Sequence, residues 1–390
     1  MILPLSYSIL TDSSLKSSRP TFAAIDILRG FAALSVLVHH VIELGGWSLF
    51  PTAGPLVWFR IGWMGVDLFF VISGFVIALS AFAGIERDGP SNFRGSFMKK
   101  RLLRIVPLHY LTMLVFLVFI TPELLFERFW INLLSHLFFV HNFHFKLHGG
   151  INGANWSLAT EMQFYLLIAI VAPWLKSTAY WKFSLLFIAI AVCWRWAMIA
   201  LFPPDPVYAT FPLFVAATQL PGMLDEFAIG ILLARLFLSA RFASFIQRCR
   251  QPGGLLVVII AVTFSLSLIF SIFWSHSNFW DNKAMVIFFR TGLAISFGAL
   301  VFLFCLIKIS GIWSLILKPF TYLGVISFGI YLWHLPVLLS LKRIKWLPPQ
   351  DLLMYTILIT CLFAALSWHF FEKPFLDSSA EKREKNLIAS

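Results

Sequence analysis

Long apolar stretches recur along this chain and limit its fold more than any other feature. A membrane-spanning helix needs about 20 mostly apolar residues. Hydrophobic residues make up 59% of the 390 residues and charged residues only 12%, whereas a soluble domain is about half apolar and about a quarter charged. This composition excludes a soluble enzyme, a nucleic-acid-binding protein and a disordered chain. Apolar and polar residues do not alternate along these stretches, as they do along the strands of a membrane barrel. We therefore predict an all-α polytopic membrane protein.

About ten segments have the length and hydropathy of a membrane-spanning helix. They are residues 25–44, 61–83, 105–121, 157–175, 183–202, 212–238, 255–274, 284–307, 319–341 and 352–371. Most Lys and Arg residues fall on the side that carries both termini, so the positive-inside rule predicts cytoplasmic termini. The more polar stretch 124–140 is expected to be interfacial or re-entrant. We expect cytoplasmic tails at 1–20 and 377–390 around one membrane domain at 21–376.

The first predicted span contains ionisable residues, which are costly at membrane depth and often functional. Arg29 and His40 lie eleven residues apart in IDILRGFAALSVLVHH. On a helix this step returns to within about 20° of the same face with a rise of about 16 Å. His39 points about 100° away, which favours a packing role. The alternative for the pair is an Arg that snorkels to the interface and a His bonded to a neighbouring carbonyl.

Asp67 lies among aromatic residues in the second predicted span. A buried carboxylate needs a cation or a hydrogen-bond donor, and we expect Arg29 or His40 to supply it. A packing role and a catalytic role for Asp67 both stay open. The same segment holds three glycines that permit close approach of another helix: Gly62, Gly65 and Gly74.

A basic segment, FMKKRLLRIVPLHY, begins the third predicted span and contains Lys100, Arg101 and Arg104. One interpretation is a positive-inside anchor. The two arginines are three residues apart on one helix face, which also suits binding of a phosphate.

The predicted outer loop 136–156 is rich in His, Asn and aromatic residues, a composition that suits stacking on sugar rings. Its histidines have no acidic or thiol partner at a zinc-binding spacing, so we expect no metal. Trp156 and Ser157 follow at the start of the fourth span, with Glu161 one turn inside. In SFGIYLWHLPV, Tyr331 and His334 share a helix face. The alternative for such polar stripes is contact between helices.

Taken in order, these segments resemble the integral-membrane acyltransferase family 3, which includes O-antigen and exopolysaccharide O-acetyltransferases. The matching segments are IDILRGFAALSVLVHH, GVDLFFVISGFVI, KKRLLRIVPLHY, NWSLATEMQFY, GMLDEFAIGILLA, SFGIYLWHLPV and FFEKPF. The resemblance covers about residues 25–376. It implies a multi-pass enzyme of the cytoplasmic (inner) membrane that moves an acyl group, expected to be acetyl, from cytoplasmic acyl-CoA to a hydroxyl of a cell-surface glycan or lipid-linked sugar.

The resemblance also implies roles for individual residues. The catalytic candidates are His40 as general base, with Glu161 and Asp67 in support. The candidates that bind the acyl-CoA co-substrate are Arg29, Arg101, Arg104 and Lys100. The candidates that contact the acceptor are Trp156, Ser157, Tyr331 and His334. Membrane lipid is the further expected partner, and no nucleic acid is expected.

Two other functions fit a polytopic protein with buried charges. One is a transporter of polysaccharide precursors or small amphiphiles, although the two halves show no matching pair of helix interruptions. The other is a structural subunit of a glycan-synthesis complex. The choice between direct transfer and an acyl-histidine intermediate also stays open, because an imidazole can act as base or as nucleophile.

Overall fold

The computed structural model describes residues 23–203, 210–276 and 279–376, and within these ranges it contains helices and no strand. The predicted tails 1–20 and 377–390 lie outside the described residues. The α-helices are α1 (Ala23–Leu44), α2 (Gly65–Val115), α3 (Phe129–Leu137), α4 (Trp156–Ser177), α5 (Tyr180–Leu201), α6 (Phe211–Ala217), α7 (Leu220–Leu238), α8 (Ala243–Arg250), α9 (Pro252–Ser275), α10 (Lys283–Leu306), α11 (Ile312–Ile316), α12 (Lys318–Val325), α13 (Ser327–Leu341) and α14 (Pro349–Ser367).

Among the described residues, seven helical stretches are long and apolar enough to cross a membrane. Two bent pairs, α7 with α8 at 79° and α12 with α13 at 71°, raise this number to nine if each pair is one span. The all-α polytopic class is therefore confirmed. The lipid-facing character is plain in α9, because only 11% of its most apolar window is buried and a helix with so little protein contact needs an apolar solvent.

The number of spans differs from the ten predicted segments chiefly at α2. Segments 61–83 and 105–121 both fall in one helical stretch, Pro55–Ile120. A straight helix of the length of α2 would measure about 77 Å, more than twice the hydrocarbon thickness of a bilayer. Gly89 interrupts α2 with a φ of 79°, and Pro90 follows it. A positive φ suits glycine, and the next proline lacks an N–H, so the helix is divided here into two parts of span length.

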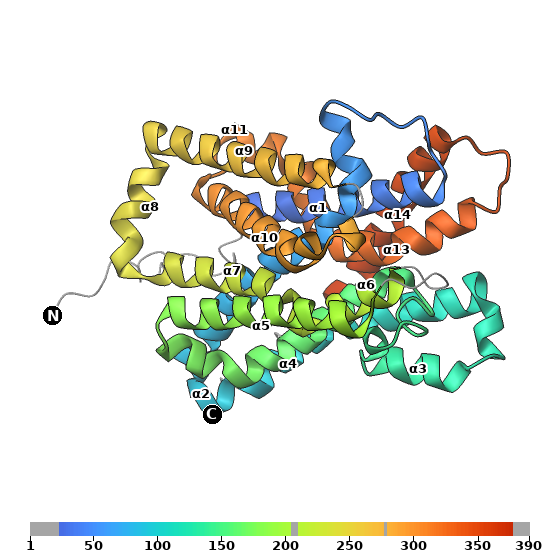
Figure 1. Ribbon diagram of the computed structural model, residues 1–390, viewed down its shortest axis with the longest axis horizontal. Coiled ribbons are helices and arrows are strands. Elements are labelled where there is room, and N and C mark those ends of the chain that lie inside the picture. The colour runs from blue at the N-terminus through green and yellow to red at the C-terminus, as the bar shows by residue number, and fades with distance from the viewer. Residues whose placement is uncertain (1–22, 204–209, 277–278, 377–390) are drawn as a thin grey trace. The chain divides into compact units, whose positions relative to one another are not determined.

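The chain forms two compact units. The described part of the first unit comprises residues 23–29, 67–83 and 171–324 apart from the gaps given above. In it α5 packs along α7, and α10 packs against α5, α7 and α9 (Figure 1). A side chain at Gly74 of α2 would collide with the backbone of Phe227, and one at Gly230 of α7 would collide with that of Val71. Glycine at both positions therefore permits the close contact between α2 and α7, as predicted for Gly74.

The described part of the second unit comprises residues 30–66, 84–170 and 325–376. In it α13 packs along α14. The 3₁₀ helix η2 (Pro55–Met64) lies against α1, where the Trp58 indole donates to the Ser35 hydroxyl at 2.7 Å. The nine residues of α3 are too short to cross a bilayer, in agreement with the interfacial or re-entrant prediction for 124–140.

Candidate functional site

His40 and His334 form a contact pair in the second unit. Nδ1 of His40 on α1 lies 3.0 Å from the carbonyl oxygen of Val36 and 3.1 Å from Nε2 of His334 on α13. The centres of the two imidazole rings are 5.0 Å apart. His40 is half-buried and His334 is buried. The structure thus joins the predicted base to one of the predicted acceptor-binding residues.

The contacts define which nitrogen of each ring holds a hydrogen. A carbonyl oxygen only accepts, so a ring nitrogen bonded to it must donate. Nδ1 of His334 lies 2.6 Å from the carbonyl oxygen of Tyr331, so Nε2 of the neutral His334 is an acceptor. Nδ1 of His40 therefore donates, shared between His334 and Val36. Nε2 of the neutral His40 keeps its lone pair, and within the described part of the chain no group bonds to that atom.

Tyr331 extends this chain of contacts from α13 to α4. The Tyr331 hydroxyl donates to the carbonyl oxygen of Ala154 at 2.8 Å, and the Ser157 hydroxyl lies 2.6 Å from the Tyr331 hydroxyl. Both side chains are buried. Four predicted residues, from His40 through His334 and Tyr331 to Ser157, are therefore connected by hydrogen bonds.

Ser157 begins a polar stripe on α4, continued by Glu161 and Tyr165 at intervals of four residues. The Tyr165 hydroxyl donates to Oε1 of Glu161 at 2.6 Å. Glu161 is also close enough to Tyr331 to act on it electrostatically. At the other end, the Arg101 guanidinium lies 5.9 Å from the centre of the Tyr165 ring. The stripe runs about 12 Å along α4 and connects the histidine pair to a predicted phosphate-binding arginine.

Arg104 has protein partners that sequence analysis did not assign to it. Its guanidinium lies 3.3 Å from the buried carboxylate of Glu372 and 4.7 Å from the centre of the Trp368 ring. Nη2 also donates to the carbonyl oxygen of Val325 at 3.3 Å. Glu372, which lies in the FFEKPF segment, is thus a charge partner of Arg104. Lys100 is exposed.

Two predicted site residues, Asp67 and Arg29, belong to the first unit. Asp67 accepts a hydrogen bond from Nη1 of Arg290 on α10, so the expectation that Arg29 or His40 would be its partner is corrected. Arg29 pairs with Asp26 on α1 at 3.6 Å. A buried carboxylate needs a cation beside it, and the sequence around Asp67 does not show that this cation is Arg290.

The predicted outer loop 136–156 buries most of its histidines. His136, His141 and His148 are at most 2% exposed, and only His144 is exposed. His136 and His141 stack with ring centres 4.0 Å apart, and His148 stacks on Trp156 at 5.6 Å. These side chains fill the loop interior, so one face of Trp156 is covered by protein.

Burial sets the charge of this histidine cluster. It lowers the pKa of His136 to about 2, that of His141 to about 4 and that of His148 to about 3. All three are neutral at pH 7, because desolvation disfavours the cationic ring. Over residues 23–203, 210–276 and 279–376, no three His, Cys, Asp or Glu side chains gather in a way that would hold a metal ion.

Comparison with known proteins gives the family. The sequence model of an acyltransferase domain matches residues 22–372, which is most of the chain. The chain belongs to the acyltransferase-3 family. This membership agrees with the ordered motifs and with the multi-pass helical architecture.

Family members with curated names are similar over most of this chain. It is 28% identical to the "Putative peptidoglycan O-acetyltransferase YrhL" of Bacillus subtilis, over 90% of this chain and 54% of that protein. It is 26% identical to the peptidoglycan O-acetyltransferase OatA of Listeria monocytogenes, over 92% of this chain and 56% of that protein. The O-acetyltransferase OatA of Staphylococcus aureus is 25% identical, over 90% and 56%. The chain therefore spans about half the length of these relatives. No solved structure matches it significantly.

Sequence analysis missed the partners of several charged residues. Arg195, Arg290 and Glu372 each lie within or at the end of an apolar helix and are buried. A signal was present for the two arginines, because an ionisable residue in an apolar span needs a partner. The sequence did not say which of the available carboxylates that partner is.

Proposed function

We propose that this chain is a membrane O-acetyltransferase that moves an acetyl group from acyl-CoA to a hydroxyl group, with His40 as general base. One observation carries the proposal. Nδ1 of His40 is held as a donor by Val36 and His334, which leaves the lone pair on Nε2. A neutral imidazole with a fixed tautomer suits proton abstraction at neutral pH.

The chemical step follows from that lone pair. Nε2 of His40 takes the proton of the acceptor hydroxyl while the hydroxyl oxygen forms a bond to the thioester carbonyl carbon. The carbon–sulfur bond breaks, and the leaving thiolate takes the proton back from the imidazolium. His334 acts as a positioning residue, because its Nε2 accepts from His40 in both protonation states and supports the cationic ring.

The polar stripe on α4 supports a place for the donor. A CoA thioester has an anionic nucleotide and a long arm, so its binding needs cations separated from the base. We place the nucleotide phosphates at Arg101, Arg104 and Lys100, and the arm along Glu161 and Tyr165, about 12 Å of helix. Arg29 is proposed to bind the CoA end as the family resemblance implies.

The acceptor is proposed to be a glycan of the cell surface. Two of the similar proteins carry the word peptidoglycan in their names, which supports this class. Ser157 and Trp156 are proposed to contact the sugar, next to Tyr331. About half of each relative lies outside the match, so the acceptor of this chain is identified by its own experiment.

The orientation is proposed from the charge distribution, with both termini cytoplasmic in an inner membrane. Lys146, which is exposed in the loop after α3, then faces the extracytoplasmic side. A Lys146→Cys variant in intact cells should react with an impermeant thiol reagent. Labelling only after the membrane is made permeable would place this loop in the cytoplasm and overturn the acceptor assignment.

The deciding experiment uses purified protein in nanodiscs with acetyl-labelled CoA thioester and peptidoglycan fragments or other glycans. An acetyltransferase transfers the label to a hydroxyl, and mass spectrometry identifies the acceptor. The transporter predicted as the alternative would leave the thioester and every glycan unmodified. Absence of transfer and of thioester hydrolysis with all acceptors would overturn the proposal.

A further inference from the structure

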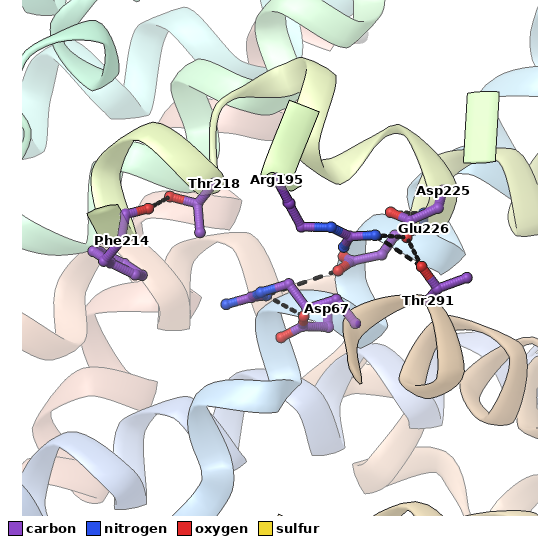
Figure 2. Close-up of polar contacts among 8 residues, drawn as sticks. Asp67, Arg195, Phe214, Thr218, Asp225, Glu226 and Thr291 are labelled. Atoms are coloured by element: carbon purple, nitrogen blue, oxygen red, sulfur yellow. Dashed lines mark hydrogen bonds and ion pairs between the residues drawn. The ribbon is translucent and has the colours of Figure 1, made fainter. Parts of the chain in front are cut away.

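The core of the first unit contains a cluster of ionisable groups that the proposed reaction does not use (Figure 2). Four helices contribute to it: α2, α5, α7 and α10. Each of its charged residues is at most 3% exposed: Asp67, Arg195, Asp225, Glu226 and Arg290. Ionisable groups so deeply buried in a membrane protein need neutralising partners.

One pair in this cluster is complete. Nη2 of Arg195 donates to Oδ2 of Asp225 at 2.6 Å and lies 2.8 Å from the Thr291 hydroxyl oxygen. The Thr291 hydroxyl donates to the same Asp225 oxygen at 2.5 Å. One guanidinium and one carboxylate thus neutralise each other with good geometry.

The remaining charges do not balance. Arg290 donates to Oδ1 of Asp67 and lies 3.8 Å from Oε1 of Glu226. A single guanidinium therefore faces two carboxyl groups. If both were ionised, the cluster would hold three negative and two positive charges, and an uncompensated charge in this interior is strongly unfavourable.

The hydrogen bonds lead to the same imbalance. The side chains of Glu226 and Asp67 are close enough to share a hydrogen bond, yet two carboxylates have no hydrogen to donate. Taken as carboxylates, Oε1 and Oε2 of Glu226 and Oδ2 of Asp67 accept no hydrogen bond from the described residues. Buried polar atoms are normally paired. One proton between the two groups would supply both the missing donor and the missing positive charge.

We propose that Glu226 and Asp67 form a buried proton-binding site, in which Glu226 is a neutral acid and donates a hydrogen bond to the Asp67 carboxylate. Asp67 then keeps the charge that pairs with Arg290, and the cluster is neutral. Arg195 and Asp225 neutralise each other with help from Thr291, and among the described residues Nε and Nη1 of Arg195 donate to no group. A proton is favoured over a metal ion because the described residues form no metal-binding group.

The test compares infrared spectra of the full chain in nanodiscs at neutral pH. The wild type should show the carbonyl stretching band of a protonated carboxyl group, and Glu226→Gln should remove it. Glu226→Gln should also keep the thermal midpoint, because an amide replaces a neutral acid of the same shape. Asp225→Asn is the matched control and should lower the midpoint, since it leaves Arg195 without a carboxylate.

A second measurement on the wild type keeps the proposal testable if the variants fold poorly. Labelling glutamate with ¹³C at its carboxyl carbon should shift the protonated-acid band, whereas the same labelling of aspartate should not. An absent band, a band that shifts only with labelled aspartate, or a midpoint of Glu226→Gln as low as that of Asp225→Asn would overturn the proposal. A thermal midpoint that is higher in a sodium salt than in a choline salt at equal ionic strength would show that the site binds a sodium ion, and it would overturn the proton-binding proposal.

Discussion

The polar clusters around Asp225 in the first unit and around His334 in the second unit differ in their chemistry. In the first unit, guanidinium and carboxylate groups meet, as in Arg195 and Asp225, which are fully buried 2.6 Å apart. The second unit also contains the Arg104–Glu372 ion pair, but around His334 imidazoles and hydroxyls meet. His40 contacts His334, and the Tyr331 hydroxyl contacts the Ser157 hydroxyl. Both arrangements pair polar groups inside an apolar protein.

The difference shows why chemistry is expected in one unit and rigidity in the other. A buried ion pair uses its charges on its own partner, and separating the pair is costly. In a chain of neutral imidazoles, every ring N–H can donate a hydrogen bond while one ring nitrogen keeps an unused lone pair. Nε2 of His40 is that nitrogen. Four predictions test this contrast, beginning with the largest expected effect.

The first compares two neighbouring histidines on α1. His40→Ala should reduce acetyl transfer about 10²–10⁴-fold, the usual contribution of a general base. His39→Ala should change turnover little, because Nδ1 of His39 is engaged with the backbone carbonyl of Arg60 at 2.9 Å. Turnover and thermal midpoint are measured for both variants. Equal loss in both, or an active His40→Ala, would remove His40 as the base.

The second separates the ion pair of the first unit. Arg195→Met should lower the free energy of unfolding by about 3–5 kcal/mol, because Asp225 is left charged and unpaired. The double variant Arg195→Met/Asp225→Leu should recover most of that loss, since a buried apolar pair replaces a buried ionic one. Denaturation in detergent measures both. An unchanged free energy of unfolding in Arg195→Met would mean that the ion pair is not desolvated.

The third concerns the basic residues of the second unit. Arg101→Ala should raise the KM for acetyl-CoA about tenfold or more, which corresponds to loss of a charged hydrogen bond, with kcat nearly unchanged. Arg104→Ala should also lower stability, because Glu372 loses its cation. Arg104→Ala/Glu372→Gln should restore the thermal midpoint but not the KM. An unchanged KM in both arginine variants would exclude the phosphate role.

The fourth and smallest effect concerns pH. His136, His141 and His148 have lowered pKa values in the folded protein, so the unfolded chain binds more protons below about pH 6.5. Stability should therefore fall as the pH decreases from about 6.5 toward 4, by about 1.4 kcal/mol per pH unit for each such group. His136→Asn should reduce this slope by the contribution of one histidine, about 1.4 kcal/mol per pH unit. The exposed His144→Asn is the control and should leave the slope unchanged; a wild type with no slope would contradict the neutral cluster.

Several features of the fold and the site were predictable because they depend on local sequence. The length of the apolar stretches determines the membrane class, since a helix must satisfy its own backbone in lipid. The start of α4 at Trp156, and the close approach allowed at Gly74, follow from neighbouring residues. The different directions of His39 and His40 follow from the helical period alone.

Which residues pair was decided only by the tertiary structure. Asp67 bonds to Arg290, 223 positions away, and His40 bonds to His334, 294 positions away. The sequence showed that each buried ionisable group needs a partner, but several residues of the right charge were available. The composition of residues 136–156 suggested stacking on sugar rings, whereas packing buries three of the four histidines in this range. Local patterns set helices and their faces, while the choice of partner depends on which helices meet, and that is a long-range property of the packed chain.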